Sequence, residues 1–172
     1  RSTLFPYTTL FRSEAAGADG MVEAQVVVAS PGVPPKSPLT PCFAVGRGAW
    51  LQIGSQQTRL AIFRTADQAR AALLQVRRGA DWQTVALLPR LGLLRTTGGE
   101  AALRFVNVST EAAGATAVLR LAGTVQAGPA IWRAVCELRA QANSDIIAYS
   151  LSVTPDFDAE VTAFEGPMLV AD

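Results

Sequence analysis

The amino-acid sequence predicts an all-β protein, an antiparallel β-sandwich, and three observations lead to that prediction. Residues 101–172 alternate between apolar and polar side chains over successive runs of about ten residues. Turn-forming residues separate these runs at regular intervals. In the first half of the chain, short apolar segments are divided by glycines. Short strands with turn signals at this spacing are typical of antiparallel sandwiches and barrels.

Five segments of the second half are expected to be strands. In the third of them, Trp132, Cys136 and Leu138 fall on one face, while Arg133 and Glu137 fall on the other. Successive side chains of a strand point to opposite faces, so the Trp132 face is expected to lie in the core. The five segments are 101–109, 116–126, 130–142, 145–154 and 159–170, with turn signals at 111–114, 127–129, 142–145 and 155–158.

The first half is expected to hold a flexible lead, a proline-rich loop and several short strands. Residues 14–20 are small and polar, and Met21–Ser30 is rich in β-branched residues, which favours a strand. Residues 31–41 contain five prolines. Proline donates no ladder hydrogen bond, so this stretch is expected to be a loop or an edge segment. Short strands are expected at 43–45, 49–53 and 59–64, and residues 21–172 are expected to form a single domain.

Residues 65–88 allow two interpretations. Thr65 and Gln68 have capping-box spacing, and a helical stripe runs from Ala69 to Val76, so a short helix near 66–78 is one of them. The other is a β-hairpin in which the two arms flank Gly79 and Ala80. The β context on both sides slightly favours the hairpin, and both interpretations stay open at this point.

Composition excludes several kinds of chemistry. The chain has no histidine, which rules out Ser-His-Asp catalysis, histidine-ligated zinc and imidazole pH switching. Charged residues make up 17% of the chain and no basic run exceeds Arg77–Arg78, so nucleic acid is not expected as a partner. No apolar run reaches the ~18–20 residues of a membrane span. Cys42 and Cys136 are expected to be buried hydrophobes, with a disulfide between them as the alternative.

The start of the chain has a separate explanation. Thr3–Ser13 reads TLFPYTTLFRS, and this string resembles one translated frame of a common short-read sequencing adapter. Residues 1–13 are therefore set aside as a probable adapter-derived artefact before the fold is considered. The natural N-terminus, with any secretion signal, is expected to be missing. An extracellular or virion-associated location is favoured.

Four pieces of the last seventy residues or so resemble carbohydrate-binding-type jelly-roll modules of bacterial glycosidases and phage tail proteins. They are a small-residue hairpin at 111–121, a Trp-Arg pair that starts the segment Trp132–Val135, a strand through 146–153, and a closing segment, 164–170. The resemblance implies a jelly-roll-like sandwich. It also implies that the Trp-Arg strand packs across the core and that the closing strand returns to the middle of a sheet.

Aromatic side chains are the candidate ligand-binding residues, because their flat faces can stack on sugar rings. Trp82 and Tyr149 both neighbour polar positions, and Trp50 is a third candidate. Asp156, Asp158 and Glu160 alternate after Pro155 and could form an oxygen cage for Ca²⁺, but a solvated acidic turn is the expected outcome. No metal site, cofactor or catalytic residue is therefore predicted.

The favoured function is a non-catalytic module for surface recognition or assembly. It could be a glycan-binding appendage or a structural domain of a phage tail or virion. The expected partners are a glycan, the parent polypeptide or virion subunits, and oligomerisation stays open. The alternative is a small hydrolase or isomerase that uses only carboxylates, with Asp81, Glu100 or Glu137 as acid and base.

Overall fold

A computed structural model describes residues 32–65 and 69–171. Their compact unit begins at Pro34, and every regular element in it is a β-strand. The all-β prediction is thus confirmed, while the strand expected at 21–30, the flexible lead and the adapter-like stretch lie outside the described residues. The strands are β1 (Cys42–Arg47), β2 (Trp50–Ser55), β3 (Thr58–Arg64), β4 (Ala69–Arg78), β5 (Asp81–Leu88), β6 (Leu93–Thr96), β7 (Gly99–Ala102), β8 (Asn107–Ala113), β9 (Thr116–Ala127), β10 (Ala130–Gln141), β11 (Ile147–Pro155), β12 (Val161–Glu165) and β13 (Val170–Ala171).

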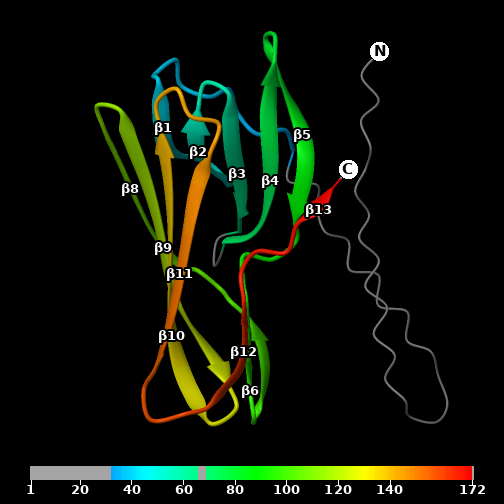
Figure 1. The fold of residues 1–172 in the computed structure, drawn as a ribbon, viewed down its shortest axis with the longest axis vertical. Helices are drawn as coiled ribbons and strands as arrows, with labels where there is room; N and C mark the ends of the chain where they lie inside the picture. Colours follow the sequence, from blue (N-terminus) through cyan, green and yellow to red (C-terminus); the bar gives the residue numbers. More distant parts are fainter. Residues whose placement is uncertain (1–31, 66–68, 172) are drawn as a thin grey trace, which may run out of the picture. The chain divides into compact units, whose positions relative to one another are not determined.

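The strands form three antiparallel sheets that pack as two layers (Figure 1). One layer is the four-stranded sheet, in the order β11-β10-β9-β8. The opposing layer consists of a six-stranded sheet, β1-β2-β3-β4-β5-β13, and a three-stranded sheet, β12-β6-β7. Strands β1 and β2 contact β9 and β10, whereas β6 and β7 contact β9. The long hairpin β9–β10 therefore supports both opposing sheets, as expected of a β-sandwich.

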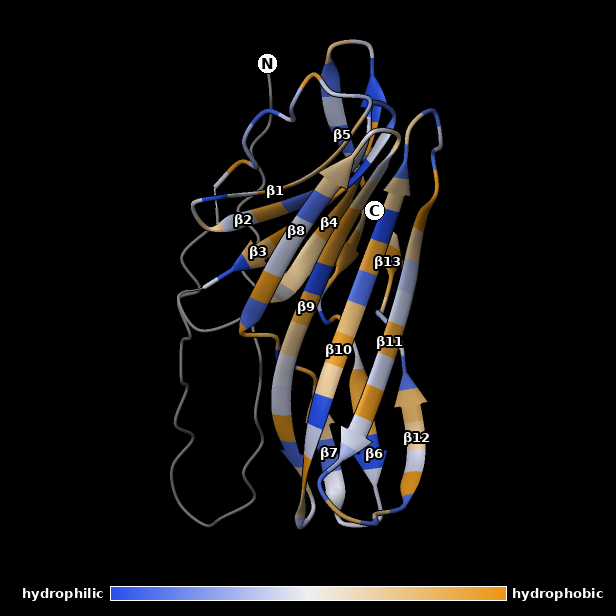
Figure 2. Ribbon diagram, turned by 90° about the vertical axis from the view of Figure 1, so that its left-hand side faces the viewer, coloured by the Kyte–Doolittle hydropathy of each residue, from blue (hydrophilic) through white to orange (hydrophobic). Residues whose placement is uncertain are grey.

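Strand β10 alternates as its sequence predicts. Trp132 and Leu138 are each 1% exposed, whereas Ile131, between Ala130 and Trp132, is 50% exposed. Apolar and polar bands follow one another along the strands of the four-stranded sheet (Figure 2). The opposite face of that sheet carries arginine, glutamate, serine and threonine, as is usual for an antiparallel sheet with one face in water.

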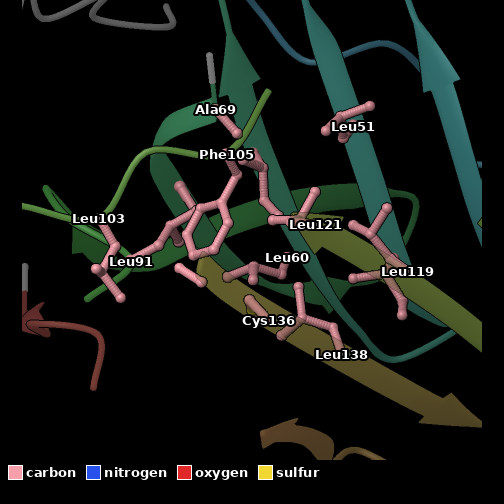
Figure 3. Close-up of a cluster of buried hydrophobic side chains, with 14 of the residues drawn as sticks. Leu51, Leu60, Ala69, Leu91, Leu103, Phe105, Leu119, Leu121, Cys136 and Leu138 are labelled. Carbon is pink, nitrogen blue, oxygen red and sulfur yellow. The ribbon is translucent and has the colours of Figure 1, made fainter. Parts of the chain in front are cut away.

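The core lies between the layers and draws on all three sheets. Figure 3 shows Leu51 and Leu60 of the six-stranded sheet beside Leu119 and Leu138 of the four-stranded sheet. Burial of one such leucine side chain stabilises the fold by roughly 1.5–3 kcal/mol. The prediction that both cysteines are buried hydrophobes is confirmed and the alternative, a disulfide, is wrong, because Cys42 and Cys136 are both buried and unbonded.

Residues 69–88 form a hairpin, so the helix considered for 66–78 is wrong over Ala69–Arg78, and residues 66–68 lie outside the described part. Strand β4 pairs with β3 on one side and with β5 on the other. The two ladders give hydrogen-bond partners to most backbone groups of β4, whereas a short isolated helix would leave the groups at both of its ends without partners. Gly79 takes a φ of +62° in the two-residue turn, a conformation that glycine adopts without strain.

The strand expected at 101–109 is interrupted. Strand β7 ends at Ala102 and β8 begins at Asn107, because the intervening backbone crosses over β9 and buries Phe105 completely. The crossing is so close that a Cβ atom on Gly123 would lie 2.0 Å from the carbonyl oxygen of Arg104. Phe105 also accepts a backbone hydrogen bond from Ala69, which ties the crossing to β4.

The closing segment also differs from the expectation. It divides into β12 and β13, which belong to different sheets, and both lie at sheet edges, not in the middle of a sheet. Gly166 and Pro167 separate the two pieces, and proline cannot donate to a ladder. The expectation that the closing strand returns to the middle of a sheet is therefore wrong.

Substitutions at two neighbouring residues of β10 test which face of the strand lies in the core. We expect Trp132→Ala to lower the free energy of unfolding by roughly 3–5 kcal/mol, because it leaves a large cavity between the layers. Ile131→Ala, one position away on the solvent face, should change it by less than about 0.5 kcal/mol. Denaturant unfolding of both variants measures the difference, and equal effects would contradict the described register.

Candidate functional site

The structure does not bring the three predicted ligand residues into one site. Trp50 and Trp82 point away from the main core, from strands β2 and β5 of the six-stranded sheet. Tyr149 lies on β11 opposite Leu138 and packs against the core. Its hydroxyl donates a hydrogen bond to the carbonyl oxygen of Leu91. Burial raises the pKa of this hydroxyl above its usual range.

Trp50 and Trp82 are both engaged within the chain. Trp50 is only 5% exposed and meets Phe63 edge to face, with ring centroids 5.6 Å apart. The guanidinium carbon of Arg59 lies 4.6 Å from the ring centroid of Trp82. A cation over an aromatic face contributes about 0.5–2 kcal/mol. One face of the Trp82 ring is therefore already occupied by the protein's own cation.

Arg59 is the centre of a polar cluster on this face. It is 3% exposed, and it forms no ion pair with any carboxylate of residues 32–65 and 69–171. Its Nε donates to Oε1 of Gln75 at 2.8 Å, and its Nη1 donates to Oε1 of Gln52 at 3.1 Å. Burial lowers the pKa of Arg59 to about 10, so the side chain is still a cation at neutral pH. Neutral oxygens and the Trp82 ring therefore solvate a buried positive charge.

The same cluster fastens the proline-rich segment onto the sheet. Nη1 of Arg59 donates to the Pro35 carbonyl oxygen at 3.0 Å and to Oγ of Ser37 at 2.8 Å. Gln52 donates to the same Pro35 oxygen at 2.9 Å. Residues 32–41 contain no strand, as predicted for the described part of the proline-rich stretch. The proline-rich segment thus covers the outer face of the six-stranded sheet at Gln52 and Arg59, and Arg59 in turn stacks on Trp82.

The carboxylates of the enzymatic alternative lie on three different sheets. Asp81 is exposed at the start of β5, and Glu100 on β7 accepts from Nε of Arg95 at 2.9 Å. Glu137 on β10 accepts from Arg120 and Arg139, and the hydrogen bond from Arg120 is the main cause that lowers the pKa of this carboxyl. The structure brings no two of the three together.

The acidic turn after Pro155 is solvated. Asp156, Asp158 and Glu160 are exposed, and Oδ1 of Asp156 accepts from the backbone N–H of Ile131 at 3.0 Å. The described part of the chain contains no group of three or more side chains able to hold a metal ion.

Two shallow hollows are present, of about 180 and about 200 Å³. Asn107, Thr124 and Arg133 line the first, and Phe157 and Asp158 line the second. Ligand sites usually span roughly 300–1,000 Å³. Neither hollow has the size expected of an enzyme cleft.

The most unusual surface is the C-terminal edge, residues 161–171, which the sequence analysis did not single out. Five large apolar residues along it are between 40% and 61% exposed. Val161 and Phe164 are separated by small and polar residues, and Met168–Val170 is a continuous apolar run. Short apolar runs of this kind are typical of buried strands, so the sequence alone did not indicate their exposure. These five, called here the apolar edge residues, are Val161, Phe164, Met168, Leu169 and Val170.

An ion-pair cluster holds the C-terminal edge in place. Oε2 of Glu165 accepts from Nη2 of Arg90 at 2.8 Å, and Oε1 accepts from Nη1 of Arg95 at 2.6 Å. Both arginines come from the segment 90–96 beside β12. Val161 and Phe164 therefore belong to a strand that is held on one side by the ladder with β6 and by paired charges, whereas Met168 and Leu169 lie in the link to β13.

Comparison with protein-family models, with curated proteins and with solved structures finds no match to this chain. Within residues 32–65 and 69–171, no helix has the length and apolarity required to span a membrane.

The Arg59 cluster can be tested by one substitution. Arg59→Met keeps much of the side-chain volume but leaves the oxygens of Pro35 and Gln75 without this donor, so we expect a loss of roughly 2–4 kcal/mol of unfolding free energy. The control Arg104→Met removes an exposed arginine and should cost less than about 0.5 kcal/mol. Chemical denaturation measures both, and an Arg59→Met protein as stable as the original would contradict the cluster's role.

Burial also predicts a loss of stability at alkaline pH. Burial raises the pKa of the Cys136 thiol to about 12, whereas an unfolded thiol ionises near pH 9. The folded state therefore keeps a proton that the unfolded state releases, and stability falls as pH rises above about 9. Between about pH 8 and about pH 10 we expect a decrease on the order of 1 kcal/mol. Urea unfolding should show a smaller decrease for Cys136→Ala, and an unchanged slope would contradict this assignment.

Proposed function

We propose that this chain is a non-catalytic β-sandwich module that assembles with another polypeptide through its C-terminal edge. It would serve as an appendage of a larger protein, such as a glycosidase, or as a structural domain of a phage tail or virion. The observation that carries the proposal is the exposure of the five apolar edge residues along β12, the link that follows it and β13. Contiguous exposed apolar surface marks interaction sites in folded proteins.

The form of the proposal based on glycan binding has less support. Trp50 is buried, Trp82 has Arg59 on one ring face, and Tyr149 packs against the core. Sugar rings stack on exposed aromatic faces, and these three side chains do not form such a platform.

The carboxylate enzyme also has less support. Asp81, Glu100 and Glu137 lie on separate sheets, and two of them are neutralised by arginines. Acid–base hydrolysis needs two carboxyl groups held at a defined separation across the substrate, usually within about 10 Å.

Two measurements on the purified chain test the proposal. In sedimentation velocity we expect concentration-dependent association, since an exposed apolar strand also attracts other copies weakly. Phe164→Ser and Leu169→Ser should reduce it, whereas Ile131→Ser, which removes a comparably exposed residue from the four-stranded sheet, should not. On a glycan array we expect no saturable binding.

A monomer at every concentration that binds a sugar would replace assembly with glycan recognition. A monomer that binds neither a sugar nor an added peptide strand would overturn both forms of the proposal.

A further inference from the structure

From the C-terminal edge we infer the kind of partner: an extended segment of a different polypeptide that adds as an antiparallel strand to β12 and carries basic residues at its carboxyl end. This inference rests on the proposed function and deepens it. It follows from the open backbone of the edge, from the placement of its one proline and from the charge beside it.

The C-terminal edge is open along its whole length. Strand β12 is the outermost strand of the three-stranded sheet, and β13 is the outermost strand of the six-stranded sheet. Between them, the N–H of Met168 donates to the carbonyl oxygen of Arg90 at 3.3 Å. Residues 161–171 therefore run antiparallel beside residues 86–96, and no described strand pairs with their other side (Figure 1). Unpaired strand edges are templates for another strand.

The open edge is protected at two points, by Pro167 and by the register shift between Val161 and Ala163. Pro167 cannot donate a hydrogen bond, so strand addition is blocked between β12 and β13. Residues 161–165 carry no lysine or arginine, which are the charges that often guard an edge. A partner strand can therefore pair with β12, while its apolar side chains cover Val161 and Phe164.

The charge beside β12 distinguishes between partners. Asp156, Asp158 and Glu160 are exposed just before the strand, and none of them forms an ion pair within the described residues. Residues 156–171 contain no basic residue, and the arginines beside β12, Arg90 and Arg95, are already paired with Glu165, so a second copy would add the same acidic flank and no unpaired positive charge. Opposite charge across an interface steers and selects a partner. A different polypeptide with basic residues meets this requirement.

The direction of the partner follows from the ladders. Every strand pair of the described chain is antiparallel, and antiparallel pairing is slightly more stable per residue. In an antiparallel addition the carboxyl end of the partner lies at the start of β12. Its basic residues are therefore expected at that end, next to Asp158 and Glu160.

A designed peptide tests the inference on the full chain. The probe is a fluorescein-labelled peptide, Thr-Val-Thr-Val-Thr-Lys-Lys amide, titrated by fluorescence anisotropy. We expect saturable binding. Three control peptides should bind roughly three- to tenfold more weakly: one with both lysines at the amino end, one with glutamates in place of lysines, and one with proline in place of the central threonine.

Variants of the chain locate the site. Glu160→Lys should weaken probe binding by a similar factor, whereas Glu111→Lys, on an exposed position of β8, should leave it unchanged. Phe164→Ser should also weaken binding. The three substituted residues are exposed or lie at a sheet edge, so circular dichroism should show the same β-rich spectrum for each variant.

Three results would overturn the inference: no saturable binding, equal binding of the glutamate peptide, or a discrete dimer that the probe does not displace. If Phe164→Ser and Leu169→Ser still reduce association while the probe fails to bind, the proposed function stands and the strand-addition inference falls. If neither effect is seen, both fall.

Discussion

The burial of one face of the β9–β10 hairpin supports most of the described structure. Both strands place their apolar positions toward two opposing sheets at once, so the six-stranded and the three-stranded sheet share a single core. Trp132 and Leu119 are among its completely buried side chains. Because side chains of a strand alternate, this burial leaves the other face of the hairpin polar and open to water. The backbone that crosses close to Gly123 and buries Phe105 covers part of the same hairpin.

The six-stranded sheet differs from the four-stranded sheet, because its outer face as well as its core face is largely shielded from water. The proline-rich segment covers part of that face, and Arg59 links the segment to the sheet through the oxygens of Pro35 and Gln75. A buried cation without an acid partner is costly unless neutral acceptors solvate it, and the cluster supplies them. The tryptophans that look like ligand platforms in the sequence are part of this internal arrangement.

The C-terminal edge is a sheet edge on which the described chain leaves several large apolar side chains exposed. Folded domains commonly guard their edge strands with lysine, proline or bulges, and here only Pro167 and one register shift near Val161 do so. The ion pairs of Glu165 with Arg90 and Arg95 keep this strand ordered although its outer side is open. An exposed apolar edge on a strand with these contacts is the observation behind the proposed assembly.

The sequence by itself determined the strand character of the chain and the inward face of β10, because a period of two is a local property that any strand-forming segment displays. It also excluded catalysis, zinc binding and pH switching that depend on histidine, because the chain contains none. Only the tertiary structure decided that 69–88 is a hairpin, since β3 supplies the second ladder from outside the segment. The tertiary structure likewise decided that Phe105 interrupts a strand and that Trp82 stacks on Arg59. It alone decided that residues 161–171 lie at an edge, because a strand-like sequence specifies which side chains share a face and not whether a neighbouring strand covers them.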